Sequence, residues 1–329
     1  SIGCAATDQG TAADEPGTAR DAEPDEPTID TESGQEETAT NRDGGTDKNG
    51  DACKEWSSNP EVAGQIQASE LTESSGLARS LNYPSHIWTH NDSGGKARLF
   101  LLAEDGTAAG TIQLRGIDAI DWEALAYGPC PERSDRSCIF VGDIGDNDAK
   151  RKSVKIHYFA EPRNVLERQS PLTVENVHSI SVQYEEGPRD AEALLLHPDT
   201  GNLFIADKNG AGEVSIFRLT NAQLKTDDKM HKIDSWADFD IESPAPYGRM
   251  VTGGAFEPSG REVAFRTYGH IIQFCLKNRT FRDALRRGTY NRLDIIAPIQ
   301  SEAISYGVQT DSLWLTGEGP DAPILKLSP

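Results

Sequence analysis

A motif that recurs five times along this chain constrains its fold more than any other feature of the sequence. Each copy begins with a small or acidic residue, which is followed by a small residue and an apolar run. A turn then leads to a second apolar strand that ends in polar residues, and a third strand follows. The copies start at Ser75, Glu123, Glu192, Thr252 and Glu302, about 48, 69, 60 and 50 residues apart. Such spacings suit four-stranded units with variable connections. The sequence therefore predicts an all-β chain with a single β-propeller of five blades, or six if one copy is degenerate.

The two ends of the repeated region predict how the ring closes. A strand-like run, Gly64-Gln65-Ile66-Gln67, precedes the first copy, and the last copy ends after its third strand, Ile324-Leu325-Lys326-Leu327. The last blade therefore lacks an outer strand, and the first blade has one strand to spare. Pairing these two runs would remove the exposed sheet edges. We expect a propeller that is closed by an N-terminal outer strand.

The first 52 residues differ sharply from the rest in composition. They hold 14 acidic and 3 basic residues and almost no large apolar ones, so they cannot bury enough surface to offset the entropy of ordering. We expect residues 1–52 to be a disordered acidic tether and residues 53–329 to be the propeller domain. Ser1-Ile2-Gly3-Cys4 resembles the end of a bacterial lipoprotein signal, which predicts lipidation at Cys4. The alternative is an N-terminal remnant with an incidental cysteine.

The other four cysteines bear on the cellular compartment. Cys130 and Cys138 flank a polar loop between two strand-like runs, so a disulfide across this hairpin is geometrically easy. Cys53 and Cys275 then remain as a second candidate pair. None of the four has the paired spacing of a zinc site. Disulfides form in oxidising compartments, so we expect an exported protein of the bacterial cell envelope, lipid-anchored at the outer membrane, in the periplasm or on the cell surface.

The charge of the chain limits its partners. A formal net charge of −21 argues against nucleic acid, because neutralising phosphates requires clustered Lys and Arg. It also disfavours anionic membrane surfaces, so we expect contact with a membrane through the lipid anchor only. Divalent cations suit such a chain better. We expect a monomer whose partner is an extracellular protein, a glycan or a phosphorylated small molecule.

The first residue of each repeat is a candidate metal ligand. The first strand of a propeller blade lines the central channel, so the five copies would bring three carboxylates and two hydroxyls together. Carboxylates at such short range repel one another unless a cation lies among them. An all-oxygen set rich in carboxylates suits Ca²⁺ better than zinc, copper or magnesium. The sequence predicts an axial Ca²⁺ held by Ser75, Glu123, Glu192, Thr252 and Glu302. The alternative is that each Glu caps its strand and bonds backbone amides or water.

These repeat starts resemble those of the calcium-activated nucleotidases (the apyrase family), which are five-bladed propellers with a calcium ion on the axis. The resemblance implies that Ser75 before Gly-Leu, the three Glu and, as a hydroxyl substitution, Thr252 ring the calcium. Asn91-Asp92-Ser93-Gly94-Gly95 looks like the family's Asp-Asp-Arg-Thr-Gly segment without its Arg. Lys208 and Arg266 correspond to its basic residues after later second strands. The resemblance extends from about residue 64 to the end, through short motifs.

Two further motifs resemble those of an uncharacterised group of exported bacterial propeller lipoproteins. They are Asp121-Trp122-Glu123 and Gly142-Asp143-Ile144-Gly145-Asp146-Asn147. The second motif is not a dinucleotide fingerprint, because it opens no helix and its acidic residues would repel phosphate. We expect its glycines to permit a tight loop. Asp146 and its neighbours would then line the channel mouth, either for a function or as simple turn residues.

Two functions fit these features. The first is a surface binding or scaffold module with an axial Ca²⁺. The second is a calcium-dependent hydrolase of phosphoesters or phosphoanhydrides, nucleotides included, whose metal polarises the phosphoryl group or activates water. As a hydrolase, the chain would use Asp92, His90 or Asp146 in catalysis and Lys208 and Arg266 to hold phosphate. Convergence of these five side chains in one open pocket above the metal would favour the hydrolase, and dispersed positions the binding module.

Overall fold

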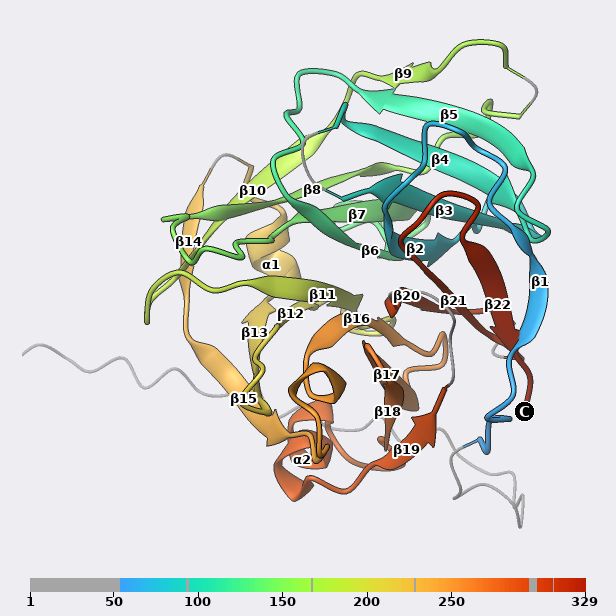
Figure 1. Ribbon diagram of the computed structural model, residues 1–329. Helices are drawn as coiled ribbons and strands as arrows, with labels where there is room; N and C mark the ends of the chain where they lie inside the picture. Colours follow the sequence, from blue (N-terminus) through green and yellow to red (C-terminus); the bar gives the residue numbers. More distant parts are fainter. Residues whose placement is uncertain (1–53, 93–94, 167, 228, 296–300, 310) are drawn as a thin grey trace, which may run out of the picture. The chain divides into compact units, whose positions relative to one another are not determined.

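The computed structural model describes residues 54–92, 95–166, 168–227, 229–295, 301–309 and 311–329. The described residues form five β-sheets, arranged as the blades of a propeller (Figure 1). The predicted all-β propeller of five blades is confirmed, and the described residues contain no sixth sheet. The expected tether of residues 1–52, with Cys4, lies outside the described residues, as does Cys53.

Each blade runs from an innermost to an outer strand, with a few added edge strands. In chain order the blades begin at β2, β6, β11, β16 and β20. Blade one contains β2 (Ser74–Arg79), β3 (His86–Asn91), β4 (Arg98–Ala103), β5 (Ala108–Leu114) and β9 (Leu172–Val174). Blade two contains β6 (Trp122–Pro129), β7 (Ser137–Asp143), β8 (Val154–Ala160), β10 (His178–Tyr184) and β14 (Met230–Ile233). Blade three contains β11 (Ala191–Leu196), β12 (Leu203–Asp207), β13 (Glu213–Leu219) and β15 (Ser235–Asp240).

The last two blades follow the same plan. Blade four contains β16 (Val251–Phe256), β17 (Glu262–Thr267), β18 (His270–Cys275) and β19 (Asn291–Asp294). Blade five contains β20 (Ser301–Tyr306), β21 (Leu313–Gly317), β22 (Pro323–Leu327) and β1 (Glu61–Gln65). Short helices lie in the connections: α1 (Asn221–Leu224), α2 (Phe281–Arg287) and a 3₁₀ turn (Pro246–Gly248). Among the described residues no helix is long and apolar enough to cross a bilayer.

The ring closes as the sequence predicts. The N-terminal strand β1 pairs antiparallel with β22, and Val62 lies opposite Leu325. The five innermost strands also contact one another in order around the axis, with β2 meeting both β6 and β20. Every blade edge that faces the axis is therefore covered by its neighbours.

The burial of the strands explains their sequences. The innermost strand β11 reads Ala-Glu-Ala-Leu-Leu-Leu and is buried at every position, because it has a neighbouring blade on each face. The outer strand β10 alternates between buried and partly exposed residues, as expected for a strand with one solvated face. Trp88, Trp122 and Trp314 lie within strands and pack inside the propeller, each exposed by 1% or less.

One buried carboxylate joins the first two blades. Glu161, which follows β8, accepts hydrogen bonds from Ser80 Oγ (2.5 Å), the Asn82 backbone N–H (3.0 Å) and Trp88 Nε1 (2.8 Å). A buried carboxylate is tolerated when its oxygens are satisfied in this way. Glu161 therefore has a structural role.

The cysteines agree with an oxidised protein. Cys130 and Cys138 form the predicted disulfide across the β6–β7 hairpin, with their Cα atoms 4.9 Å apart. Cys275, at the end of β18, is also disulfide-bonded.

Candidate metal centre

The predicted ligands occupy equivalent irregularities in the five innermost strands. In β6, Trp122 lies opposite Asp143 and Ala124 opposite Gly142, so Glu123 is an extra residue without a partner in register. The strand register shifts by one residue in the same way at Glu192, Thr252 and Glu302. In β2 the shift falls between Ser74 and Leu77, the interval that contains Ser75. A bulge turns a side chain away from the alternation of its strand. Five equivalent bulges thus give the five repeat starts corresponding positions beside the axis.

Burial makes this part of the channel electrostatically unusual. Glu123, Glu192 and Glu302 are each only 4% exposed. Burial, and then the charge of Glu302, raises the pKa of Glu192 to about 8. Burial, and then the charge of Glu192, also holds the pKa of Glu123 well above its usual range. Three buried carboxyl groups are costly to ionise together without a compensating cation.

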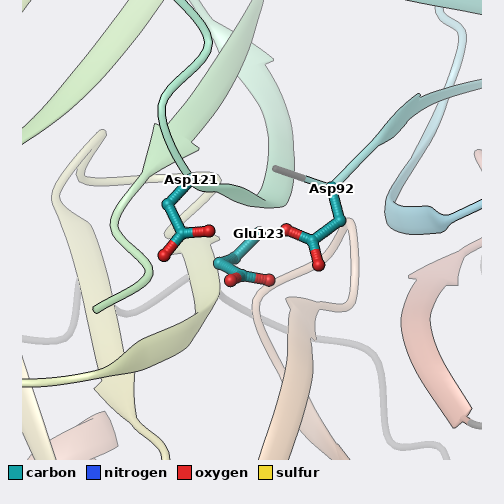
Figure 2. A group of neighbouring side chains, drawn as sticks. All are labelled: Asp92, Asp121 and Glu123. Carbon is teal, nitrogen blue, oxygen red and sulfur yellow. The ribbon is translucent and has the colours of Figure 1, made fainter. Parts of the chain in front are cut away.

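Glu123 is the centre of an acidic cluster. One group consists of Asp92, Asp121 and Glu123, and a second of Glu123, Asp190 and Glu192; in each group one oxygen per residue lies within 4.8 Å of the others. Figure 2 shows the first group, with the carboxylates of Asp92 and Asp121 on either side of Glu123. Calcium ligands lie about 2.3–2.6 Å from the ion, so two of them are at most about 5 Å apart. Both groups fit that limit, and we call these five residues the acidic cluster.

The two hydroxyl residues of the predicted set join neighbouring blades. Ser75 Oγ donates to the Glu123 carbonyl oxygen at 2.8 Å, and Thr252 Oγ1 donates to the Ser301 carbonyl oxygen at 2.7 Å. Each hydroxyl uses its hydrogen in this bond, so its oxygen can still act as a metal ligand. Glu302 lies on the same ring of bulges but belongs to neither group of the acidic cluster.

The Gly142–Asn147 motif, which comprises the end of β7 and the loop that follows it, positions Asp121. The Asp143 carboxylate accepts hydrogen bonds from the backbone N–H groups of Ile120 (3.4 Å) and Asp121 (3.3 Å), and it forms a 2.6 Å ion pair with Arg151. A Cβ atom at Gly145 would overlap Glu123 Oε1 and lie 2.6 Å from Asp121 Oδ2. The glycine is required because the two carboxylates pack against its backbone.

The same loop also positions Asp190. The Asp146 backbone N–H donates to Asp190 Oδ1 at 2.8 Å. The Asp146 carboxylate accepts the backbone N–H groups of Lys150 and Arg151, both at 2.8 Å. Asp146 therefore orders its own loop and directs only its backbone toward the acidic cluster.

His90 lies inside the protein. Its side chain is fully buried, its Nδ1 lies 2.7 Å from the Asn91 carbonyl oxygen, and its ring packs edge-to-face on Trp122 at 5.6 Å. Burial lowers the pKa of His90 to about 4. Of the three predicted catalytic residues, only Asp92 belongs to the acidic cluster.

The two predicted phosphate-binding residues lie beside the channel carboxylates. Lys208 forms an ion pair with Glu192, and its ammonium group lies 5.4 Å from the centre of the Tyr268 ring. Arg266 is 1% exposed and donates from Nη2 to Ser301 Oγ at 2.5 Å. Burial lowers the pKa of Arg266 to about 10. Lys208 borders the acidic cluster, whereas Arg266 is enclosed between blades four and five.

Three members of the acidic cluster were not among the predicted ligands: Asp92, which was predicted as a catalytic residue, Asp121 and Asp190. Asp121 and Asp190 each stand two residues before a repeat-start Glu, in Asp121-Trp122-Glu123 and Asp190-Ala191-Glu192. This shared Asp-x-Glu pattern is the signal that could have identified them.

Apolar side chains close the channel on the other side of the acidic cluster. Leu77, Leu125 and Leu195, from three innermost strands, line a cavity of only about 20 Å³ with Gly254 and Phe256. The three leucines are at most 3% exposed.

Comparison with known proteins adds little beyond the fold. No family model matches the chain, and no curated protein matches it. Among solved structures, a protein from Xanthomonas campestris described as a gluconolactonase is similar at 12% identity and a TM-score of 0.44, over 82% of this chain and 94% of that chain.

Proposed function

We propose that this protein is an extracytoplasmic binding module that holds a Ca²⁺ ion at one end of its propeller channel and uses it to bind an oxygen-rich partner. The observation that carries the proposal is the position of Glu123, which is shared by two groups of carboxylates of a size that fits one ion. Asp92, Asp121, Glu123, Asp190 and Glu192 would hold the ion.

The donor chemistry favours calcium among divalent cations. The acidic cluster consists of carboxylates only, and hard oxygen donors in a flexible arrangement suit Ca²⁺. Magnesium demands tighter octahedral geometry and usually keeps several waters. Lys208 neutralises one carboxylate by pairing with Glu192, which leaves an excess of negative charge for a divalent ion.

Binding is favoured over catalysis by the state of the expected acid–base residues. His90 is buried and held neutral, and the carboxylate of Asp146 is occupied by its own loop. The bound ion would supply a positive centre at an otherwise acidic channel mouth. Carboxylates of a protein or hydroxyls of a glycan are the groups that would complete its coordination.

A calcium-dependent phosphohydrolase is the second candidate, and one observation favours it. Lys208 lies next to Glu192 with its ammonium group over Tyr268, so a cationic side chain borders the proposed ion. Such a pair would position and neutralise a phosphoryl group.

The location outside the cytoplasm is supported by the Cys130–Cys138 disulfide, because such bonds persist in oxidising compartments.

The two candidates are separated by assays on the full chain. Binding to glycan and extracellular-protein panels, with calcium or with chelator, should show a partner that Glu123→Gln loses and Glu257→Gln retains. Glu257 is a matched control, because it is equally buried and its carboxylate accepts hydrogen bonds from Ser259 and Arg261 in its own turn. Calcium-dependent phosphate release from nucleotides or phosphoesters, abolished by Glu123→Gln, would instead establish the hydrolase.

A further inference from the structure

A second concave site lies away from the channel, where blades three and four meet. It is a pocket of about 500 Å³ lined by the loop after β15 and by side chains that include Glu242, Ser243, Arg249 and Arg292. Asp240 also lines it, so two basic and two acidic residues balance the charge of the lining. The acidic cluster described above shares no residue with this pocket.

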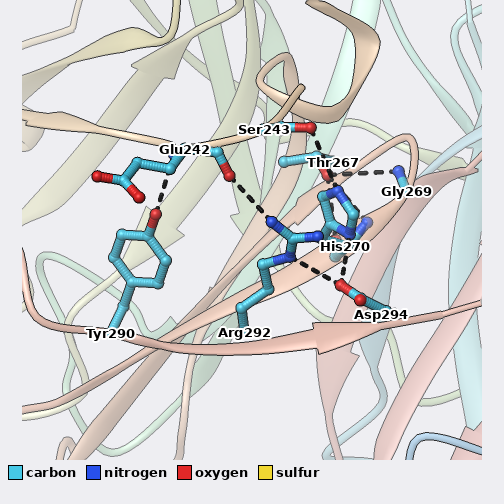
Figure 3. A network of polar contacts seen from close by, with 8 residues as sticks. All are labelled: Glu242, Ser243, Thr267, Gly269, His270, Tyr290, Arg292 and Asp294. Carbon is cyan, nitrogen blue, oxygen red and sulfur yellow. Dashed lines mark hydrogen bonds and ion pairs between the residues drawn. The ribbon is translucent and has the colours of Figure 1, made fainter. Parts of the chain in front are cut away.

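Three side chains beside this pocket are arranged as a nucleophile, a base and an acid (Figure 3). Ser243 Oγ lies 3.5 Å from His270 Nε2, and His270 Nδ1 lies 2.9 Å from Asp294 Oδ1. The three residues come from separate segments: the loop after β15, the start of β18 and the end of β19. The spacing between nucleophile and base is often looser before substrate binds. The order Ser–His–Asp is the arrangement that activates a serine hydroxyl.

The backbone around Ser243 is fixed on both sides by other segments. Arg249 Nε donates to the Ser243 carbonyl oxygen at 2.7 Å, and Arg292 Nη1 donates to the Glu242 carbonyl oxygen at 3.1 Å. Tyr290 Oη accepts the backbone N–H of Glu242 at 3.0 Å. Such support holds the hydroxyl in place before any ligand arrives.

The histidine is fixed in the same way. Thr267 Oγ1 accepts the backbone N–H groups of Gly269 (3.3 Å) and His270 (3.0 Å), which orders the turn between β17 and β18. The His270 side chain is only 14% exposed. Both partners of the Ser243–His270 contact are thus anchored independently of each other.

A glycine makes the close approach of these two residues possible. A Cβ atom at Gly248 would overlap Ser243 Oγ and lie 3.0 Å from His270 Nε2. Gly248 ends the 3₁₀ turn that packs over the pair. Any larger residue there would push the serine and the histidine apart.

We propose that Ser243 and His270 form a nucleophile–base pair that hydrolyses small carboxylic esters in this pocket, with Asp294 as a positioning residue. Ser243 Oγ bonds to the ester carbonyl carbon while its proton passes to His270 Nε2. The bond from that carbon to the alcohol oxygen breaks, and the alcohol leaves with the proton from His270. Water, deprotonated by His270, then cleaves the acyl-serine to release the acid and restore Ser243.

The arginines of the pocket supply the charge that this reaction needs. The residue after Ser243 is Pro244, which has no backbone N–H with which to bind a developing oxyanion. Arg249 and Arg292 line the same pocket. Each guanidinium group is held by hydrogen bonds to backbone carbonyls, and Arg292 Nε also donates to Asp294 Oδ1 at 2.7 Å. Their positive charge, together with their remaining N–H groups, would stabilise negative charge on the carbonyl oxygen.

The test is covalent labelling of the full chain with a fluorophosphonate, followed by peptide mass spectrometry. We expect an adduct on Ser243 that is absent in Ser243→Ala and at least about 100-fold slower in His270→Gln. Gly248→Ala should also slow labelling, and Asp294→Asn should slow it less, because Asp294 acts through His270. Ser235→Ala is the matched control, since the Ser235 hydroxyl bonds to a carboxylate, Asp238, outside the pocket. Hydrolysis of p-nitrophenyl acetate should follow the same order.

Two results would overturn the proposal. One is a protein that unfolds cooperatively, and so was folded, yet forms no adduct on Ser243. The other is labelling that proceeds at the wild-type rate in His270→Gln. Labelling should also survive chelation of metal ions, which separates this site from the proposed Ca²⁺ centre.

Discussion

Gly145 packs so closely against Glu123 that any side chain at position 145 would overlap the Glu123 carboxylate. The glycine belongs to the loop after β7, and the glutamate to the bulge of β6. The loop and the bulge therefore depend on each other, and the acidic cluster forms only where they meet.

This relationship predicts that Gly145→Ala weakens metal binding by at least about tenfold, because the new methyl group displaces the carboxylates of Glu123 and Asp121. Terbium luminescence measures the effect, since Trp122 lies next to Glu123 in the chain and can sensitise a bound lanthanide. Gly269→Ala is the control, because a Cβ atom there would meet nothing within 4 Å. Equal affinities for the two variants would show that the loop does not support the site.

Stability should depend on pH through Glu192, whose pKa of about 8 is raised by burial and then by Glu302. An unfolded chain loses this proton near its ordinary pKa of about 4.3, so the folded, metal-free protein binds more protons between these values. The contribution of this group to stability is therefore present at low pH and is lost as pH rises toward about 8. We therefore expect the free energy of unfolding of Glu192→Gln, measured with urea in the presence of chelator, to rise relative to that of the wild type between about pH 6 and pH 8.

A pH-independent difference between these two proteins would contradict the raised pKa. Deprotonation of Glu192 should affect calcium affinity in the opposite direction to stability. The ion binds the ionised carboxylates, so affinity should increase with pH over this range and binding should release protons.

Replacing Glu161 should destabilise the fold without affecting the metal. Glu161→Ala leaves the donors of Ser80, Asn82 and Trp88 without their acceptor, at a cost of about 3 kcal/mol in the free energy of unfolding. Chemical denaturation measures this loss. Glu175→Ala, in an exposed pair with Arg115, should change stability by less than about 0.5 kcal/mol. If Glu161→Ala lowers the free energy of unfolding no more than Glu175→Ala does, Glu161 does not stabilise the contact between blades one and two.

Replacing the Cys130–Cys138 disulfide by two serines should cost about 2.5 kcal/mol, because the bond closes a short loop in the unfolded chain. Thermal or denaturant unfolding of the double variant checks this value. The five-bladed ring should persist, since the hairpin strands β6 and β7 pair along their whole length. Loss of the native circular dichroism spectrum in the double variant would contradict that expectation.

The sequence predicted the ring better than the details of its site. Innermost strands can be recognised in the sequence because a strand that packs between two blades must be apolar on both faces. A polar residue at the start of such an apolar run, like Glu192 in β11, is therefore easily identified. The N-terminal strand was predicted because the last blade lacks an outer strand in the sequence. The structure places its start three residues before the predicted run, at Glu61–Gln65.

The site residues that lie on loops were harder to predict. Asp190 approaches Glu123 only because a bulge in β11 and a backbone hydrogen bond from Asp146 fix it there. His90 stands near Asp92 in the chain, yet its ring is buried against Trp122. Which way a side chain points where a strand ends depends on the local backbone, and that information is absent from a motif.

Calorimetric titration of the metal-free full chain with Ca²⁺ tests the central claim most directly. We expect one ion to bind per chain, with affinity reduced by at least about 100-fold in Glu123→Gln, because that residue is shared by both groups of the acidic cluster. Affinity should be unchanged in Glu257→Gln, whose carboxylate is bonded within its own turn. Folded wild-type protein that binds no calcium, or binds it equally well without the Glu123 carboxylate, would contradict the account.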